Sequence, residues 1–194
     1  MKIGLFFGSF NPVHSGHMII ANYVLQYTEL QQIWMVLSPQ NPFKKKESLA
    51  RDYERLHLLN LATDDHPNIK PSSIEFNLPK PSYTIDTLTF LGEEYPEHEF
   101  ALIMGGDNLY SLPKWKNSEM IIENYSIYVY KRPTYELGEL ENHPNVRIVE
   151  SPQLSISATT IRKMISEGKS IQYMVPDSVF RYLDGNNIYR DLDK

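Results

Sequence analysis

The beginning of this chain limits its possible folds more than any other stretch. Residues 2–17 read KIGLFFGSFNPVHSGH, and the nearly continuous apolar run at 3–7 is typical of a strand buried on both faces of a parallel sheet. Turn-forming residues fill positions 8–12, and apolar residues recur at helical spacing from Met18 onward. The sequence therefore predicts a buried strand, a tight loop and a helix in immediate succession.

Two histidines stand where this helix begins. A helix that follows a parallel strand directs its first N–H groups toward the carboxyl edge of the sheet, where anions bind. His14 and His17 are three residues apart, so both can project on one side of that opening and donate N–H groups to phosphate oxygens. A lone histidine would more often be a packed or surface loop residue. Two at this spacing, behind Gly8, Ser9 and Asn11, favour a phosphate site.

A phosphate site of this kind has to be local, because the chain as a whole is acidic. Its 194 residues include 19 basic and 24 acidic side chains, and the net charge of −5 argues against binding to nucleic acid. With 41% hydrophobic residues, the chain suits one globular domain over residues 1–194. It contains no cysteine, which excludes disulfides and thiolate metal sites.

The sequence gives no sign of a membrane partner or of export. Its apolar runs fall far short of the roughly 20 residues that span a bilayer. Met1 is followed at once by the core strand rather than by a signal peptide. We therefore expect a cytoplasmic protein, whose oligomeric state the sequence leaves open, a homo-oligomer included.

A basic loop follows the second predicted strand, residues 33–37. Prolines punctuate residues 38–43, and three lysines occupy 44–46. A run of charge is usually a solvated face. Because the loop follows a strand, it can emerge beside the first loop, where a flexible ammonium group could reach a triphosphate. Lys44 and Lys45 are therefore candidate phosphate ligands.

The next segment predicts a helix over residues 49–62 and a strand over 69–76. We interpret Arg51, Asp52 and Arg55 of this helix as surface charges. After the strand, two prolines precede Ser82 and Tyr83, and Thr84 is a candidate N-cap for a helix that runs to residue 91. This start would be a second helix terminus able to receive an anion.

A third set of candidates follows the apolar strand predicted at residues 100–104. Gly105 and Gly106 would allow close backbone approach to a ligand, and Asp107 suits a ribose hydroxyl or a metal-bound phosphate. The alternative is that Asp107 forms an ordinary turn or helix cap. Trp115 lies between two lysines and after a proline, an unusual setting for a core tryptophan, although tryptophan more often serves packing than ligand stacking.

The last candidate site residues lie beyond two further predicted strands, 127–130 and 146–149, which a polar loop joins. Ser157 can cap a helix whose first N–H groups, with the hydroxyl of Thr159 or Thr160, face an anion. Arg162 lies about one turn further along. The alternative is an ordinary capped helix with a surface arginine. Residues 174–183 predict a final amphipathic helix, with Pro176 near its first turn.

These motifs resemble those of a known superfamily. GSFNPVHSGH at 8–17 is similar to the strand-loop-helix signature, with its HxGH element, of the nucleotidyltransferases, and ISATTIR at 156–162 is similar to their ISxTxIR element. PSYTIDTL at 81–88 and GGDNLYSLPKW at 105–115 resemble motifs of the bacterial nicotinate-nucleotide adenylyltransferases. The resemblance extends over almost the whole chain. It departs at Phe43, where such enzymes commonly have a histidine, and at Ala158, where a serine is usual.

The resemblance implies an α/β fold with a Rossmann-like parallel sheet flanked by helices. It also implies adenylyl transfer from ATP to nicotinate mononucleotide, with Mg²⁺ carried mainly by substrate and water. The acceptor phosphate is already an anion, so it needs positioning more than a general base, and the implied transfer is direct, without a covalent intermediate. The catalytic residues it implies are His14, His17, Lys44, Lys45 and Arg162.

The implied binding residues fall into two sets. For ATP they are Gly8, Ser9, Phe10, His14, His17, Gly105, Asp107, Ser157, Thr159 and Arg162. For nicotinate mononucleotide they are Ser9, Asn11, Lys44, Ser82, Tyr83, Thr84, Asp107 and Trp115. In the second set, backbone N–H groups and Thr84 would hold the nicotinate carboxylate while Trp115 stacks on the ring.

Two alternatives remain open on the sequence alone. The acceptor could be nicotinamide mononucleotide or phosphopantetheine, although enzymes for the latter look shorter and lack the motifs around Tyr83, Thr84 and Trp115. From a different class, the chain could be a regulatory protein that binds a nucleotide without turnover. Both histidines and Arg162 argue against that reading.

Overall fold

The computed structural model describes residues 1–39, 49–131, 137–152 and 154–190. Within these residues, parallel strands form one six-stranded sheet in the order β3-β2-β1-β4-β5-β6. The strands are β1 (Lys2–Gly8), β2 (Gln32–Leu37), β3 (Ile69–Ser72), β4 (Glu99–Gly105), β5 (Ile127–Tyr130) and β6 (Val146–Val149). This arrangement confirms the expected parallel α/β sheet. The strand order reverses direction at β1, which lies between β2 and β4.

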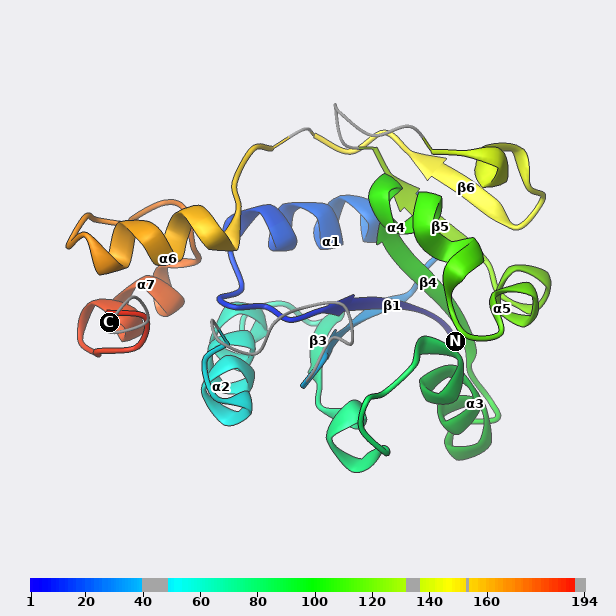
Figure 1. Cartoon of the computed structure of the whole chain (residues 1–194), viewed down its shortest axis with the longest axis horizontal. Helices are drawn as coiled ribbons and strands as arrows, with labels where there is room; N and C mark the ends of the chain where they lie inside the picture. Colours follow the sequence, from blue (N-terminus) through cyan, green and yellow to red (C-terminus); the bar gives the residue numbers. More distant parts are fainter. Residues whose placement is uncertain (40–48, 132–136, 153, 191–194) are drawn as a thin grey trace.

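Helices connect and cover the strands (Figure 1). The α-helices are α1 (Ser15–Tyr27), α2 (Asp52–Thr63), α3 (Thr84–Glu94), α4 (Gly106–Ser111), α5 (Ser118–Asn124), α6 (Ala158–Ser166) and α7 (Asp177–Asp184). Short 3₁₀ turns are η2 (Ile74–Asn77), η3 (Leu112–Lys114) and η4 (Glu139–Asn142). Figure 1 shows α6 and α7 together at one end of the molecule, next to the end of α1 where that helix begins.

The sheet has a hydrophobic cluster on each face, because alternate side chains of a strand point to opposite sides. On β1, Leu5 belongs to one cluster and Phe6 to the other. Buried residues of α1, α2, α6 and α7 join the cluster of Phe6, and those of α3, α4 and α5 join that of Leu5. The strands are therefore covered on both faces, as their continuous apolar sequences predict.

Most element predictions are confirmed, and the errors have local causes. The strand predicted at 69–76 ends at Ser72, where the chain turns into η2 and carries Glu75 inward. The helix predicted from residue 49 starts at Asp52, because Arg51, its N-cap, has a non-helical ψ of 146°. The short helices α4 and α5 were not predicted, since neither is long enough to show a helical period. In the described part of the chain, no helix could cross a membrane.

Candidate active site

The loop between β1 and α1 is held closely against the sheet. A Cβ atom at Gly8 would lie 2.8 Å from the ring of Phe10, so the glycine allows that ring to pack under its own loop. Phe10 is 1% exposed and has a left-handed backbone, with φ of 40°. The backbone N–H of Ser38, just after β2, donates to the carbonyl of Gly8 at 2.9 Å. The loop is thus fixed both to the core and to the neighbouring strand.

His14 and His17 form a stacked pair at the start of α1. Their ring centroids are 3.6 Å apart with an interplanar angle of 24°, and the rings of His17 and Phe10 make a T-shaped contact with centroids 5.1 Å apart. His14 is the N-cap residue, and its backbone N–H donates to Nδ1 of His17 at 3.2 Å. Because Nδ1 accepts this bond, the neutral ring of His17 has its hydrogen on Nε2. Nε2 is then a hydrogen-bond donor.

Helix α6 is joined to the same loop. Nη1 of Arg162 donates to the backbone carbonyl of Asn11 at 2.8 Å. Ser157 caps α6 as predicted, since its hydroxyl accepts from the N–H of Thr160 at 3.1 Å and lies 2.9 Å from the hydroxyl of Thr160. Ser157, Thr159 and Thr160 are all exposed at this helix start. The structure therefore brings Arg162 and the two histidines to the same loop from opposite ends of the sequence.

The glycine–aspartate motif leaves the sheet on the adjacent strand. Phe6 of β1 pairs with Ile103 of β4, so Gly8 and Gly105 stand at the same edge of the sheet. This is the place where the strand order reverses, the usual ligand crevice of such sheets. A Cβ atom at Gly105 would collide with the carboxylate of Asp107. Gly105 thus makes room for the protein's own side chain at this edge.

The motifs around Thr84 and Trp115 also lie close together. Nζ of Lys116 is 2.8 Å from a carboxylate oxygen of Asp86 in α3, and it stands 4.8 Å above the ring of Tyr83. Trp115 is half-buried and packs against the cluster of Leu5, so part of its surface serves the core.

The predicted N-cap of α3 is wrong by one residue. Tyr83 is the N-cap, and Thr84 is the first helical residue. The backbone N–H groups of Asp86 and Thr87 both donate to the carbonyl of Tyr83. Ser82, directly before this cap, is buried. A helix still starts at the expected place. Thr84 contributes its backbone N–H to the first turn, and its hydroxyl does not act as the cap.

Lys44 and Lys45 lie outside the described residues, so their assignment as phosphate ligands rests on the sequence alone. Gly105 and Asp107 lie at the end of β4, beside β1, and the remaining candidate residues divide between two groups. One group surrounds the start of α1 and the other surrounds the start of α3.

Comparison with known proteins agrees with this geometry. A family model described as cytidylyltransferase-like matches residues 5–164. The chain belongs to this family. Two similar proteins are named probable nicotinate-nucleotide adenylyltransferase. That of Flavobacterium johnsoniae is 53% identical over 192 residues, covering 98% of this chain and 100% of its own. That of Cytophaga hutchinsonii is 51% identical over 179 residues, covering 92% and 93%. The resemblance expected from the sequence is therefore confirmed.

A solved structure shows that the fold extends further than the sequence similarity. The nicotinic acid mononucleotide adenylyltransferase of Plasmodium falciparum, complexed with NaAD, superposes with a TM-score of 0.80. The alignment covers 97% of both chains at 19% identity. The two proteins therefore share the sheet and its helices. At 19% identity, this likeness is evidence for the fold alone.

One residue of this cytidylyltransferase-like chain is placed very differently from its sequence interpretation. Arg55, expected on the surface, is 0% exposed. Its guanidinium donates to backbone carbonyls of both loops at the site, including that of Ser9 at 2.6 Å. Helical spacing cannot reveal this, because the acceptors come from distant parts of the sequence. The nearest local signal is Asp52, three residues earlier, which accepts from Arg55 at 2.7 Å.

A buried carboxyl group was also missed by sequence reasoning. Glu75 is 3% exposed, and its Oε1 accepts from the hydroxyl of Thr87 in α3 at 3.0 Å. Burial raises the pKa of Glu75, and the nearby hydroxyls of Ser38, Ser82 and Thr87 offset only part of that rise. Glu75 is thus a buried neighbour of the first turn of α3, the helix that begins at Thr84.

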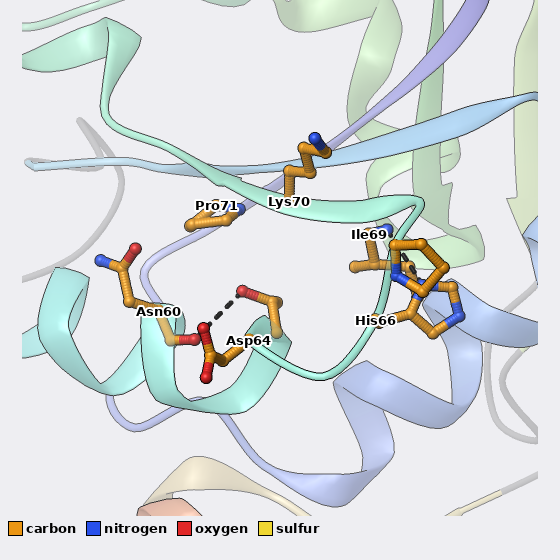
Figure 2. Close-up of a pocket in the computed structure, with 8 residues that line it drawn as sticks. Asn60, Asp64, His66, Ile69, Lys70 and Pro71 are labelled. Atoms are coloured by element: carbon orange, nitrogen blue, oxygen red, sulfur yellow. Dashed lines mark hydrogen bonds between the residues drawn. The ribbon is translucent and has the colours of Figure 1, made fainter.

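The cytidylyltransferase-like chain also has a hollow away from these motifs (Figure 2). It has a volume of about 330 Å³ and lies between the end of α2 and the beginning of β3, with Asn60, Asp64, His66 and Lys70 in its lining. Nδ1 of His66 accepts the backbone N–H groups of Asn68 and Ile69, so this side chain holds the turn into β3. The hollow is at the amino end of the strand, whereas the motifs are at the carboxyl edge.

Proposed function

We propose that this chain joins ATP to nicotinate mononucleotide, giving nicotinate adenine dinucleotide and pyrophosphate. The observation that carries the proposal is the convergence of the HxGH and ISxTxIR motifs on one loop, through the contact of Arg162 with Asn11. The names of relatives about half identical over nearly the whole chain support the same reaction. We treat residues 1–194 as one nucleotidyltransferase domain, which the continuous sheet supports.

The chemistry asks the protein mainly to position two anions. An oxygen of the acceptor 5′-phosphate forms a bond to the α-phosphorus of ATP. The bond from that phosphorus to the bridging oxygen breaks, and its electron pair leaves on pyrophosphate. The attacking phosphate is already ionised, so no general base is required. The protein has to stabilise charge on the transition state and on the leaving group.

The start of α1 and the start of α6 supply that stabilisation in this proposal. Nε2 of His17 and a ring N–H of His14 donate to phosphate oxygens, while Arg162 adds a positive charge. Gly8, Ser9 and Phe10 shape the loop beneath the phosphates, and the α6 terminus at Ser157 and Thr159 receives the other end of the triphosphate. Lys44 and Lys45 are added on the sequence alone. Asp107, beside Gly105, binds a ribose hydroxyl.

Magnesium enters this reaction with ATP. Among residues 1–39, 49–131, 137–152 and 154–190, no group of three or more His, Cys, Asp or Glu side chains is arranged to hold a metal ion. In this proposal the ion is carried by phosphate oxygens and water, which is the usual mode for Mg²⁺. The ion would neutralise charge on the leaving pyrophosphate.

The acceptor is held at the start of α3 in this proposal. The first N–H groups of α3, beginning at Thr84, bind the nicotinate carboxylate, and the exposed part of Trp115 stacks on the pyridine ring. Ser82 and Tyr83 complete that wall, and Asn11 borders the phosphate. A carboxamide gains less than a carboxylate from the positive end of a helix, so we expect the acid to be preferred over the amide.

The deciding experiment is pyrophosphate release from ATP and Mg²⁺ with three acceptors in parallel. Nicotinate mononucleotide should be used with a much higher kcat/KM than nicotinamide mononucleotide or phosphopantetheine. Equal use of the acid and the amide would remove the carboxylate pocket at Thr84 while keeping the chemistry. Nucleotide binding without release for any acceptor would favour a regulatory protein instead.

A further inference from the structure

The guanidinium of Arg55 is buried in the described structure with every one of its N–H groups in a hydrogen bond. Arginine has five such donors in a rigid plane. Their acceptors are the carbonyls of Ala50 (3.0 Å), Ser9 (2.6 Å), Ser38 (3.0 Å) and Pro39 (3.2 Å), and the carboxylate of Asp52 (2.7 Å). A buried charge is very costly unless it is satisfied in this way. The site is therefore built around an arginine.

The carbonyl acceptors come from three separate segments. Ser9 belongs to the loop that leads into α1, Ser38 and Pro39 follow β2, and Ala50 precedes α2. The first two segments leave the neighbouring strands β1 and β2 at the same edge of the sheet, and the third returns to that edge before α2. One side chain of α2 thus holds the backbone of the HxGH loop in a fixed place relative to the end of β2.

The hydrogen bonds continue from Arg55 to Arg162. The backbone N–H of Ala50 donates to Oδ1 of Asn11 at 3.1 Å, and the carbonyl of Asn11 accepts from Arg162 at 2.8 Å. Asn11 is 3% exposed, so the bond from Ala50 is shielded from water, and the bond from Arg162 is partly buried. The phenol of Tyr189 is buried nearby, and it interacts electrostatically with Arg55 and Arg162. Burial raises the pKa of Tyr189, and the charges of Arg55 and Arg162 oppose that rise.

We propose that Arg55 is a positioning residue for adenylyl transfer, which sets the place of the HxGH loop and of Arg162 without touching either substrate. The inference rests on the proposed function. Transfer between two phosphates depends on alignment, and a misplacement of about 1 Å can cost roughly a hundredfold in rate. Loss of the five-way contact should therefore reduce kcat in a protein that still binds its substrates.

The main test is Arg55→Lys, because lysine keeps the charge but has three donors on a flexible chain. We expect kcat for pyrophosphate release to fall about 10–100-fold. The KM values should change much less. Arg51→Lys is the matched control, since Arg51 lies one turn away and is exposed, and it should behave as wild type.

A second control separates positioning from stability. Leu59→Val removes a methylene-sized volume from the buried face of the same helix and should lower the melting temperature while leaving kcat unchanged. In Arg55→Ala, added guanidinium ion at millimolar concentration should restore part of the lost kcat. If Arg55→Lys has wild-type kcat below its melting temperature, or if Leu59→Val at equal stability loses as much activity, Arg55 is merely structural.

A third variant serves if both Arg55 substitutions fail to fold. Asp52→Asn keeps the shape of the acceptor and removes its charge from the half-exposed side of the pair. It should fold and lower kcat a few-fold, and an unchanged kcat would overturn the proposal. These outcomes are distinct from failure of the proposed function, in which the wild-type protein itself would release no pyrophosphate with nicotinate mononucleotide.

Discussion

The two halves of the candidate site are held together in different ways. Around the start of α1, buried and partly buried hydrogen bonds fix the loops, and their acceptors are mainly backbone carbonyls that accept from Arg55 and Arg162. Around the start of α3, Thr87 bonds the buried Glu75, but the contact that joins the Thr84 and Trp115 motifs is an ion pair between Lys116 and Asp86. Both side chains of that pair are 44% exposed. Buried charged hydrogen bonds are costly to break, whereas exposed ion pairs contribute little.

This difference matches the proposed division of labour. Charge changes at the phosphates during the reaction, so donors there act best when they are fixed in advance. The nicotinate ring only has to be bound, and a looser wall suffices for that. Substitutions in the two halves should therefore differ in the size of their effects.

The largest effect should come from His17→Ala. Removing a donor to the transition state typically costs about 10²–10³ in kcat. Thermal unfolding should show that the variant remains folded, and steady-state kinetics should show the loss in kcat. His57→Ala is the control, because His57 is an exposed histidine of α2. Near-normal turnover of pure His17→Ala would show that the stacked pair has no catalytic role.

A smaller effect is expected from Trp115→Ala. Stacking of a ring on an aromatic side chain is worth about 1–3 kcal/mol, so the KM for nicotinate mononucleotide should rise roughly tenfold or more. The kcat and the KM for ATP should stay near wild type. Trp115→Phe keeps an aromatic face and should recover most of the affinity. An unchanged KM would leave Trp115 with its packing role alone.

The exposed pair should contribute less still. A double-mutant cycle with Lys116→Met and Asp86→Asn, measured by denaturant unfolding, should give a coupling energy of about 0.2–1 kcal/mol that weakens with salt. The same cycle can be measured on the KM for the acceptor. A coupling well above that range, insensitive to salt, would mean that both halves of the site are equally rigid and would end the contrast.

The smallest effect should appear only when pH is varied. Because burial raises the pKa of Glu75, the folded chain holds that proton more tightly than the unfolded chain does. Wild-type stability is therefore lost as pH rises from the ordinary value of 4.5 through the raised value. The glutamine side chain of Glu75→Gln does not titrate. The melting temperature of this variant relative to wild type should therefore rise over this pH window and keep that rise at higher pH.

Glu29→Gln provides a control of opposite sign. Burial acts to raise the pKa of Glu29, but hydrogen bonds with Tyr128, its own backbone and Lys2 outweigh it and lower the pKa to about 2. Wild-type stability from this group is present above pH 4.5 and lost as pH falls toward 2. Removing the charge should therefore destabilise the protein at neutral pH. Equal slopes for both variants would contradict the assigned environments.

The sequence predicted the elements well wherever an apolar pattern decided them. Strands β5 and β6 lie where the pattern placed them, and α1 begins at Ser15, three residues before the first apolar residue of its pattern at Met18. Both motif groups directly follow predicted parallel strands, so they could be expected to meet at the carboxyl edge of the sheet. Spacing alone was less informative at Thr84, because tyrosine is an unusual N-cap and only the local backbone reveals it.

Arg55 marks the limit of such reasoning. Arginine is rarely buried, and whether it can be depends on carbonyls that distant loops bring to it. The same holds for Glu75, which becomes buried only because the chain turns after β3. Residues whose role is set by partners far away in sequence carry no periodic signal, and these two therefore came only from the three-dimensional arrangement.

The glycines of the site have a consequence for mutational scanning. A methyl group at Gly8 would press on Phe10, and one at Gly106 would lie 2.6 Å from Leu137, so each would meet the protein's own atoms. Substitutions there should lower the amount of folded protein in a cell, whereas substitutions of His17 should leave abundance normal. An activity screen would score both kinds as inactive. Only a parallel measurement of abundance would distinguish the residues that shape this loop from the residue proposed to use it.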